Sequence, residues 1–277
     1  MSQPTSCSYS KYGTSFGLFV VVTLSASPAA GQGCAPVLPS LVSSWDASAV
    51  SNRTVPDVKG RNPGLIVGSV SVIDGKNVQA PQSIGKLFYF NGSSYIDMHN
   101  AADFQFGTGP FSLEAFFMWD GRESPINNAK GSTINNIIRK STYPLRDLAA
   151  GYWIRINQTT RTLEFFVGET VGALGLPRAS LTASITPNTW YHVVGTKAPS
   201  GMVTLHLNGQ QVDTRTISPT FSLDSGAPFT IGAWNDRFGL TELFSGYIAT
   251  ISVYNAALPL DQVKALFETG GSGKCIQ

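Results

Sequence analysis

The chain has 277 residues, of which 42% are hydrophobic and only 13% are charged, about half the usual charged share. This length suits one large β domain, and frequent Gly and Pro favour strands and tight turns over long helices. The net charge is +2, and Lys and Arg form no long run, which argues against a nucleic-acid-binding surface. No apolar stretch approaches the roughly 18 residues that a membrane-spanning helix needs.

The N-terminal segment has the pattern of a secretory signal peptide. Lys11 precedes an apolar run at 16–24, and small residues follow at 25–31. This order predicts a signal peptide over residues 1–30, with cleavage between Ala29 and Gly31, and a secreted mature protein. The alternative is a disordered N-terminus or a buried first strand.

Three cysteines are present, and Cys7 would leave with the signal peptide. Cys34 and Cys275 then remain near the two mature ends. Because an even count in a secreted protein implies a disulfide, and domain ends usually lie close together, we predict a Cys34–Cys275 bridge. Two free thiols are the alternative. The predicted organisation is a lead-in at 31–40, one domain at 41–270 and a tail at 271–277.

Alternating apolar runs between turn residues predict strands along most of the domain. Asn91-Gly92 and Asn208-Gly209 mark turns, and 120–133 is a predicted loop. Pro259 and Gly270 bracket one predicted helix at 260–268. The pattern therefore predicts an all-β, antiparallel two-sheet sandwich with a short C-terminal helix. The expected strands are 87–90, 94–98, 111–119, 134–140, 151–156, 162–167, 190–196, 203–207, 210–212, 229–232 and 246–254.

Several segments, taken in order, resemble the laminin-G-like jelly roll of the concanavalin A-like lectin and glucanase family. The most specific is 189–194 with the following strand that ends at Asn208-Gly209, which resembles the family's Trp-x-His-Val strand and its Asn-Gly turn. The resemblance covers 41–270 and implies a jelly roll. It implies no single function, because lectins, adhesion modules, glycosidases and lyases share the fold. The other matching segments are 55–64, 90–96, 111–117, 231–232 and 244–258.

Catalytic patterns are missing from the sequence. Related hydrolases of this fold carry a Glu-x-Asp-x-x-Glu strand, whose alternation places two carboxylates on one face. Glu114 is the only acid in 111–119, and the sequence offers it no partner. The three histidines lack zinc-ligand spacing, and there is no Gly-x-Ser-x-Gly elbow. We therefore expect a protein that is not an enzyme.

The resemblance also implies a calcium ion at the rim of the sandwich, held by carboxylate and carbonyl oxygens. The candidate donors are Asp57, Asn91, Asp97 and Asp236. The chain departs from the family at Asn91, where an Asp is usual, and at Ala249-Thr250, where an acidic pair is usual. The alternative is that these residues cap turns. We expect no required cofactor, with calcium as the ion that the resemblance allows.

Two predicted loops combine aromatic rings with amide and charged groups, which is the chemistry that a sugar site needs. Rings stack on the C–H faces of a sugar, while Asn, Asp and Arg hold its hydroxyl groups. Alternation must also expose either Tyr152 or Trp153. The alternative is that these rings fill the core, where we expect Trp190. The candidate ligand-binding residues are Trp119, Asp120, Arg122, Trp153, Trp234, Asn235, Asp236 and Arg237.

Three Asn-x-Ser/Thr sequons, at Asn52, Asn91 and Asn157, would be glycosylation sites in a eukaryotic secretory pathway. Taken together, the patterns predict a secreted, non-catalytic recognition module that binds an extracellular carbohydrate. A structural adhesion module that contacts protein is the alternative, and a glycosidase or lyase of the same fold is the third hypothesis.

Overall fold

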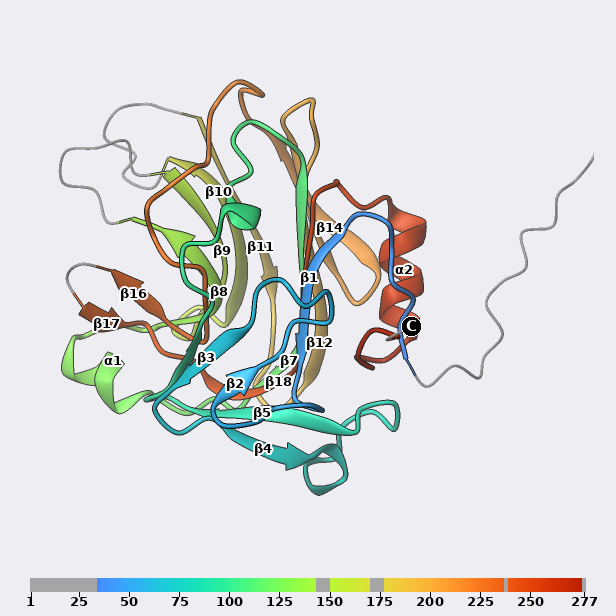
Figure 1. The fold of residues 1–277 in the computed structure, drawn as a ribbon. Coiled ribbons are helices and arrows are strands. Elements are labelled where there is room, and N and C mark those ends of the chain that lie inside the picture. The colour runs from blue at the N-terminus through green and yellow to red at the C-terminus, as the bar shows by residue number, and fades with distance from the viewer. Residues whose placement is uncertain (1–33, 143–149, 170–176, 237–238, 276–277) are drawn as a thin grey trace, which may run out of the picture. The chain divides into compact units, whose positions relative to one another are not determined.

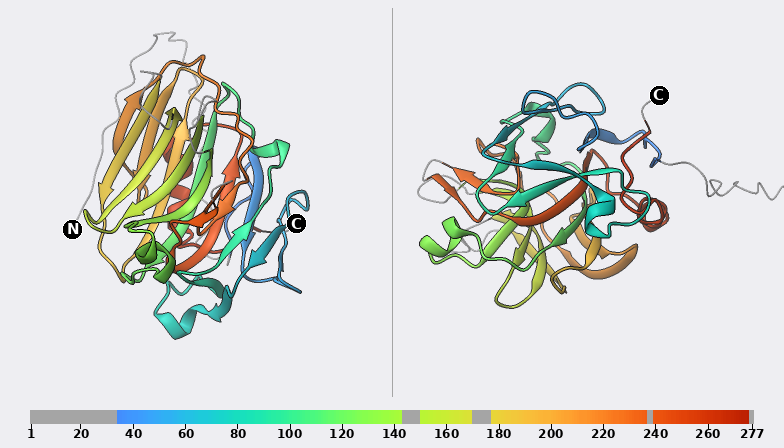
Figure 2. Two further views of the ribbon diagram at one scale, coloured as in Figure 1. Left: turned by 90° about the vertical axis from the view of Figure 1, so that its left-hand side faces the viewer. Right: turned by 90° about the horizontal axis from the view of Figure 1, so that it is seen from below.

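Two large antiparallel sheets face each other in a computed structural model of the protein (Figures 1 and 2). The structure describes residues 34–142, 150–169, 177–236 and 239–275. The predicted signal peptide and Cys7 lie outside the described residues. No helix of the described part of the chain is long and apolar enough to cross a membrane.

The first sheet runs in the order β14-β13-β12-β7-β18-β5-β4, and β1 pairs with β18 outside this path. Its centre is β7, whose neighbours β12 and β18 are both antiparallel to it. The strands are β1 (Leu41–Asp46), β4 (Ser71–Asp74), β5 (Lys86–Asn91), β7 (Phe111–Trp119), β12 (Trp190–Lys197), β13 (Met202–Leu207), β14 (Gln210–Thr216) and β18 (Ser245–Tyr254).

The second sheet runs in the order β11-β10-β9-β8-β15-β6-β3-β2. A separate two-stranded hairpin pairs β16 with β17. The strands are β2 (Thr54–Val55), β3 (Gly64–Val67), β6 (Tyr95–Asp97), β8 (Ile134–Ser141), β9 (Ala150–Asn157), β10 (Thr162–Glu169), β11 (Arg178–Ser184), β15 (Thr230–Ile231), β16 (Trp234–Asp236) and β17 (Gly239–Thr241). The two-sheet sandwich predicted from the sequence is confirmed.

The helices are short. The predicted C-terminal helix is confirmed as α2 (Leu260–Glu268), and two 3-10 turns occur, η1 (Gly75–Val78) and η2 (Ala102–Phe104). The predicted loop at 120–133 is wrong in part, because it contains α1 (Pro125–Ala129). The Ser124 hydroxyl accepts a hydrogen bond from the Asn127 backbone amide, which caps this turn of helix.

Alternation along β7 separates two environments. Leu113, Ala115, Phe117 and Trp119 point between the sheets into the main hydrophobic core. Glu114 and its outward neighbours Phe116 and Met118 lie on the other face, yet all nine residues of the strand are buried. The outward side of β7 is therefore covered by other parts of the chain.

Three elements provide that cover. Helix α2 lies beside the first sheet (Figure 1). Its Val263 and Leu266 side chains pack in one cluster with Val194 and Tyr254. The segment around η1 packs Val78 against a separate outer cluster of Ile84, Leu87, Phe116 and Ala249. The C-terminal tail supplies the third element, where a side chain added at Gly271 would meet the Phe116 ring at 2.6 Å.

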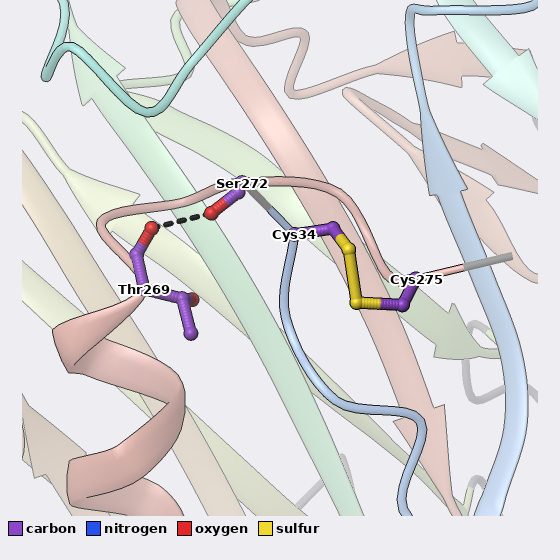
Figure 3. Close-up of a disulfide and its surroundings, with 4 residues drawn as sticks. All are labelled: Cys34, Thr269, Ser272 and Cys275. Carbon is purple, nitrogen blue, oxygen red and sulfur yellow. Dashed lines mark hydrogen bonds between the residues drawn. A yellow bond between two sulfur atoms is a disulfide. The ribbon is translucent and has the colours of Figure 1, made fainter. Parts of the chain in front are cut away.

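The two ends of the described chain are joined side by side. The predicted disulfide is present between Cys34 and Cys275, across a sequence separation of 241 residues (Figure 3). Ala35 donates its backbone N–H to Gly273 and accepts one from Cys275. The Ser272 hydroxyl also donates to the Thr269 carbonyl at the end of α2 (Figure 3). The tail is thus held against the lead-in at several points.

Removal of this disulfide should destabilise the fold strongly. In the chain-entropy description, a disulfide that closes a loop of this length adds up to about 5 kcal/mol to the free energy of unfolding. The double variant Cys34→Ser/Cys275→Ser should lose much of this free energy, which urea unfolding measures. Reductant should lower the unfolding midpoint of the native chain and leave that of the double variant unchanged. Equal midpoints for the oxidised and reduced native chain would contradict the structural role of the bridge.

Candidate functional site

The outer face of the first sheet contains a pocket of about 410 Å³ where β7 ends. It lies where the cover provided by η1 and the C-terminal tail stops. Polar side chains dominate its lining, with one aromatic ring among them. The lining residues are Asn77, Val78, Gln79, Met118, Asp120, Arg122, Asn188 and Tyr247.

Strand register explains why these groups meet. Tyr247 of β18 lies opposite Met118 of β7 on one side and opposite Tyr89 of β5 on the other. Asp120 follows the last residue of β7 and keeps the outward parity of Met118. The sequence positions are far apart, so only the pairing of β5, β18 and β7 brings them to one surface.

Aromatic rings form a continuous row beside the pocket. The ring centroids of Tyr89 and Tyr247 are 5.0 Å apart, those of Tyr247 and Trp190 are 6.5 Å apart, and those of Trp190 and Phe116 are 5.7 Å apart. The tyrosines and Trp190 are partly exposed, whereas Phe116 is covered. Trp190 was expected in the core, but its parity on β12 places it on this outer face. A sugar ring has an aromatic surface to stack on at the exposed end of the row.

Asp120 and Arg122, both predicted as ligand-binding residues, lie together in the pocket. The Asp120 side chain is only 7% exposed and accepts hydrogen bonds from the Arg122 backbone amide at 2.9 Å and the Ser245 hydroxyl at 3.0 Å. The Arg122 side chain is 72% exposed, with its Nε 3.8 Å from an Asp120 oxygen. Its Nη1 donates to the Tyr89 hydroxyl at 3.2 Å. The pair therefore consists of a buried carboxylate and a guanidinium cation that is accessible to solvent.

The surroundings of the pocket change the pKa of Tyr247. Burial, with the nearby Tyr89 hydroxyl and the Asp120 carboxylate, raises the pKa of Tyr247, against a smaller opposite effect of Arg122. Tyr247 is therefore neutral across the physiological range and keeps its O–H as a hydrogen-bond donor.

The rim of the pocket is made of tight turns. Asn188 and Gln79 both have positive φ, a conformation that Asn tolerates better than most residues. Asn188 donates its backbone N–H to the Trp119 carbonyl at 2.7 Å, which ties the turn before β12 to the end of β7. Gly121 also has positive φ, and an added Cβ would lie 2.9 Å from the Pro187 ring. The turns at Gly121 and Asn188 are therefore held close to each other and to the end of β7.

Trp119, which sequence reasoning placed at a binding surface, is 3% exposed and belongs to the main core. It stands next to Asp120 in the chain but points to the opposite face of the sheet, because strand side chains alternate. A ligand on the outer face cannot reach its ring.

Trp153, another candidate, lies on the outer face of the second sheet and is 4% exposed. Its ring stacks on Phe166 at 3.9 Å and 4°, and the guanidinium groups of Arg139 and Arg155 lie 4.5 and 4.7 Å from its centre. Its indole N–H donates to Glu164 at 3.0 Å. Alternation does turn Trp153 outward and Tyr152 inward, but neighbouring side chains cover the outward ring.

Trp234 and Asn235 lie on the β16–β17 hairpin, close to the same cluster. The Arg139 guanidinium lies 3.8 Å from the centre of the Trp234 ring and pairs with Glu242 at 2.9 Å. The Asn235 side chain donates to the Tyr95 hydroxyl. These contacts attach the hairpin to the second sheet. The Asp236 side chain and Arg237 lie outside the described residues.

Of the four candidate calcium donors, Asp57, Asn91 and Asp97 make separate sets of hydrogen bonds, and the Asp236 side chain lies outside the described residues. Asp57 is buried, and its carboxylate accepts hydrogen bonds from five donors, which leaves little capacity for a metal ion. Asn91 accepts from Ser93 and Ser94, and Asp97 accepts from the backbone of His99, as turn-capping residues do. The described residues contain no group of three His, Cys, Asp or Glu that could hold a metal ion. These side chains do not fit a calcium site.

The sequon residues are at or near the surface. Asn52 and Asn91 are exposed and Asn157 is partly exposed, so a glycan could extend from each without entering the core. A second pocket of about 240 Å³ lies beside the disulfide, where Cys34, Asp46 and Lys274 are among its lining residues. Its lining contains no aromatic ring, so it lacks the stacking surface of the first pocket.

Glu114 has several buried partners, all of them far from it in the sequence. Its carboxylate accepts hydrogen bonds from Lys274 at 2.9 and 3.2 Å and from the Tyr254 hydroxyl, and lies 3.2 Å from His192 Nε2. Lys274 arrives from the C-terminal tail, next to Cys275, so no local pattern revealed it. The side chains of Glu114 and His192 are 2% and 1% exposed, which keeps substrates away from them.

This environment controls the protonation of Glu114. Burial by itself would raise its pKa, but the Lys274 ammonium, together with His192 and the Tyr254 hydrogen bond, outweighs burial and holds the pKa well below its usual range. Glu114 is therefore a structural anion that ties the tail to the centre of the first sheet.

Comparisons with known proteins agree with this fold. The family described as the concanavalin A-like lectin/glucanases superfamily matches residues 90–264. No curated protein sequence matches the chain.

The solved structures that share the fold at low identity include two toxin binding domains and one domain of an arabinanase. The binding domain of Paraclostridial Mosquitocidal Protein 1 is 16% identical with a TM-score of 0.57, over 82% of this chain and 52% of that one. The binding domain of Botulinum Neurotoxin DC in complex with SialylT is 14% identical with a TM-score of 0.59, over 84% and 52%. Domain 4 of AbnA, a GH43 extracellular arabinanase from Geobacillus stearothermophilus, in complex with arabinotriose, is 18% identical with a TM-score of 0.55, over 82% and 97%. The chain thus spans about half the length of the toxin domains.

Substitution of Lys274 should be strongly destabilising. Lys274→Met leaves the buried Glu114 carboxylate without its cation, a change that typically costs about 3–5 kcal/mol. Chemical unfolding at pH 7 should show this loss, whereas Lys264→Met, at an exposed position of α2, should change stability by less than about 0.5 kcal/mol. Equal stability of the two variants would contradict the proposed role of the ion pair.

Stability should also fall in acid. Because the folded-state pKa of Glu114 is depressed, its contribution is complete above the unfolded value of about 4.3 and is lost as the pH falls towards the folded value. Unfolding free energies measured from pH 7 to pH 3 should therefore decrease less steeply for Lys274→Met than for the native chain. Parallel pH profiles would show that Glu114 is not the group responsible.

Proposed function

Because the chain belongs to the concanavalin A-like lectin/glucanases superfamily, we propose that it is a carbohydrate-binding module whose site is the pocket at the end of β7. One observation carries the proposal. The partly exposed rings of Tyr89, Tyr247 and Trp190 lie beside a polar pocket that contains Asp120 and Arg122. Stacking surface and hydroxyl-binding groups are the two requirements of a sugar site.

Two solved structures with the same fold support this proposal. One of them is the arabinanase domain in complex with arabinotriose, and the match covers 97% of that domain. The neurotoxin binding domain in complex with SialylT is a second. Binding by domains of this architecture supports recognition as the role of the chain, and the lining of the pocket supplies the residues that we propose for it.

We also propose that the module is non-catalytic and secreted. The buried Glu114–Lys274 pair is unsuited to acid–base chemistry on a substrate, since glycoside hydrolysis needs two placed carboxyl groups that reach the sugar. The Cys34–Cys275 disulfide favours an oxidising compartment, which supports removal of a signal peptide at 1–30 and a mature domain at 41–270 with its short flanks.

Glycan binding should need no calcium, because the Asp57 oxygens are already hydrogen-bonded and the pocket relies on rings, amides and one charge pair. The measurement is a glycan-array screen of the oxidised protein with calcium and with chelator. Equal binding in both supports the proposed site, whereas binding that disappears in chelator would require a metal site among other residues.

Tyr247→Ala should weaken binding to any glycan found in this screen by about tenfold or more, which corresponds to loss of a central aromatic contact. Since the ring is only partly buried, the loss of stability should be smaller than the ~3–5 kcal/mol typical of a buried aromatic residue. Isothermal titration calorimetry and thermal melts measure the two effects.

Phe221→Ala is the matched control, because this ring is also partly buried but does not line the pocket. It should leave affinity unchanged. Equal affinity of native and Tyr247→Ala protein would place the glycan site elsewhere. A folded sample that binds no glycan would instead favour an adhesion module that contacts protein.

A further inference from the structure

The charges that line the pocket differ greatly in their access to solvent. Asp120 and Arg122 are the two charged residues of the lining, and their side chains are 7% and 72% exposed. The remaining polar side chains of the lining, Asn77, Gln79 and Asn188, are uncharged amides at exposed positions. A ligand that enters the pocket therefore meets a positive charge and neutral polar groups, whereas the negative charge lies beneath them.

The position of Arg122 is supported by its neighbours. Asp120 Oδ1 accepts the Arg122 backbone N–H, while Asp120 Oδ2 accepts from the Ser245 hydroxyl and lies 3.8 Å from the Arg122 Nε. The Arg122 Nη1 donates to Tyr89, which stacks near Tyr247. The guanidinium is thus attached at one edge, beside the aromatic pair, and one of its five N–H donors is engaged by Tyr89. Prior ordering lowers the entropy cost of using the remaining donors on a ligand.

The chemistry of a guanidinium indicates the ligand group. Its planar fork matches a carboxylate in a two-bond arrangement, and such charge-assisted bonds are stronger than bonds to neutral hydroxyls. Neutral sugars need no accessible cation, since amides and hydroxyls are sufficient for their hydroxyl groups. A sugar stacked on Tyr247 would bring a ring substituent close to Arg122, because Tyr247 and Arg122 line the same pocket.

We infer that the pocket selects acidic oligosaccharides, with the sugar carboxylate bound by Arg122 and the sugar ring stacked on Tyr247. This inference rests on the proposed carbohydrate-binding function and specifies its ligand class. The carboxylate has two chemical sources, a hexuronic acid, which carries it at C6, or a sialic acid, which carries it at C1. Arg122 is the specificity-determining residue in either case.

The test compares matched ligand pairs that differ in the carboxylate. Trigalacturonic acid is paired with galactotriose of the same linkage, cellotriouronic acid with cellotriose, and sialyllactose with lactose. Affinities are measured by calorimetry for the oxidised native protein and for three variants. Arg122→Gln removes the charge, Arg122→Lys keeps the charge but not the fork, and Arg215→Gln is the control at an exposed position of the edge strand β14.

The native protein should bind at least one acidic member about tenfold more tightly than its neutral partner. Arg122→Gln should abolish that preference, because the affinity for the acidic member should fall about tenfold more than the affinity for the neutral member, Arg122→Lys should retain part of the preference, and Arg215→Gln should retain all of it. Thermal melts should match across the variants, because Arg122 is largely exposed. The pair that shows the preference identifies the source of the carboxylate.

Two results would overturn the inference while the proposed function stands. One is equal binding of acidic and neutral partners, and the other is an equal loss for both in Arg122→Gln. Binding of no ligand in any pair or on the wider glycan array, by protein with a native melting profile, would overturn the proposed function itself.

Discussion

The central strand β7 has to be buried on both faces, and the rest of the structure follows from this constraint. Its inward residues pack against the second sheet, as in any sandwich. Its outward residues also need cover, which helix α2, the turn around η1 and the C-terminal tail provide. Where this cover stops, near Met118, the strand continues into Asp120 and the open pocket. The candidate site thus lies at the end of β7, where this cover stops.

The same face contains two ion pairs with opposite roles. Glu114 and Lys274 of the C-terminal tail are both buried. Their pairing therefore contributes to stability and is not accessible to a ligand. Asp120 and Arg122 follow the end of β7. The Arg122 guanidinium is accessible to solvent there, and the buried Asp120 carboxylate helps to position it. Similar residue types therefore support the fold in one place and line the proposed site in the other. The difference arises from cover, because solvent access decides whether a charge can contact another molecule.

The outcome for the aromatic residues shows why candidate sites are hard to read from local composition. Trp119 and Asp120 are adjacent, yet one belongs to the core and the other to the pocket. Trp153 turns outward as alternation requires, but Phe166 and two arginines cover its ring. No local pattern predicts a ligand-binding role for Tyr89, Tyr247 and Trp190. They are brought together only by strand pairing, which for Tyr89 and Tyr247 joins positions about 160 residues apart.

Local patterns in the sequence predict the two-sheet fold, the C-terminal helix, the disulfide partners, and Asp120 with Arg122 as candidate residues. These features follow from local periodicity, turn residues and cysteine count, which are written in short stretches of chain. The accessibility of the rings, the pairing of Lys274 with Glu114 and the hydrogen bonds that engage Asp57, Asn91 and Asp97 could be read only from the folded chain. Such facts depend on strand order and on what covers each face, and both arise from long-range packing that no local pattern encodes.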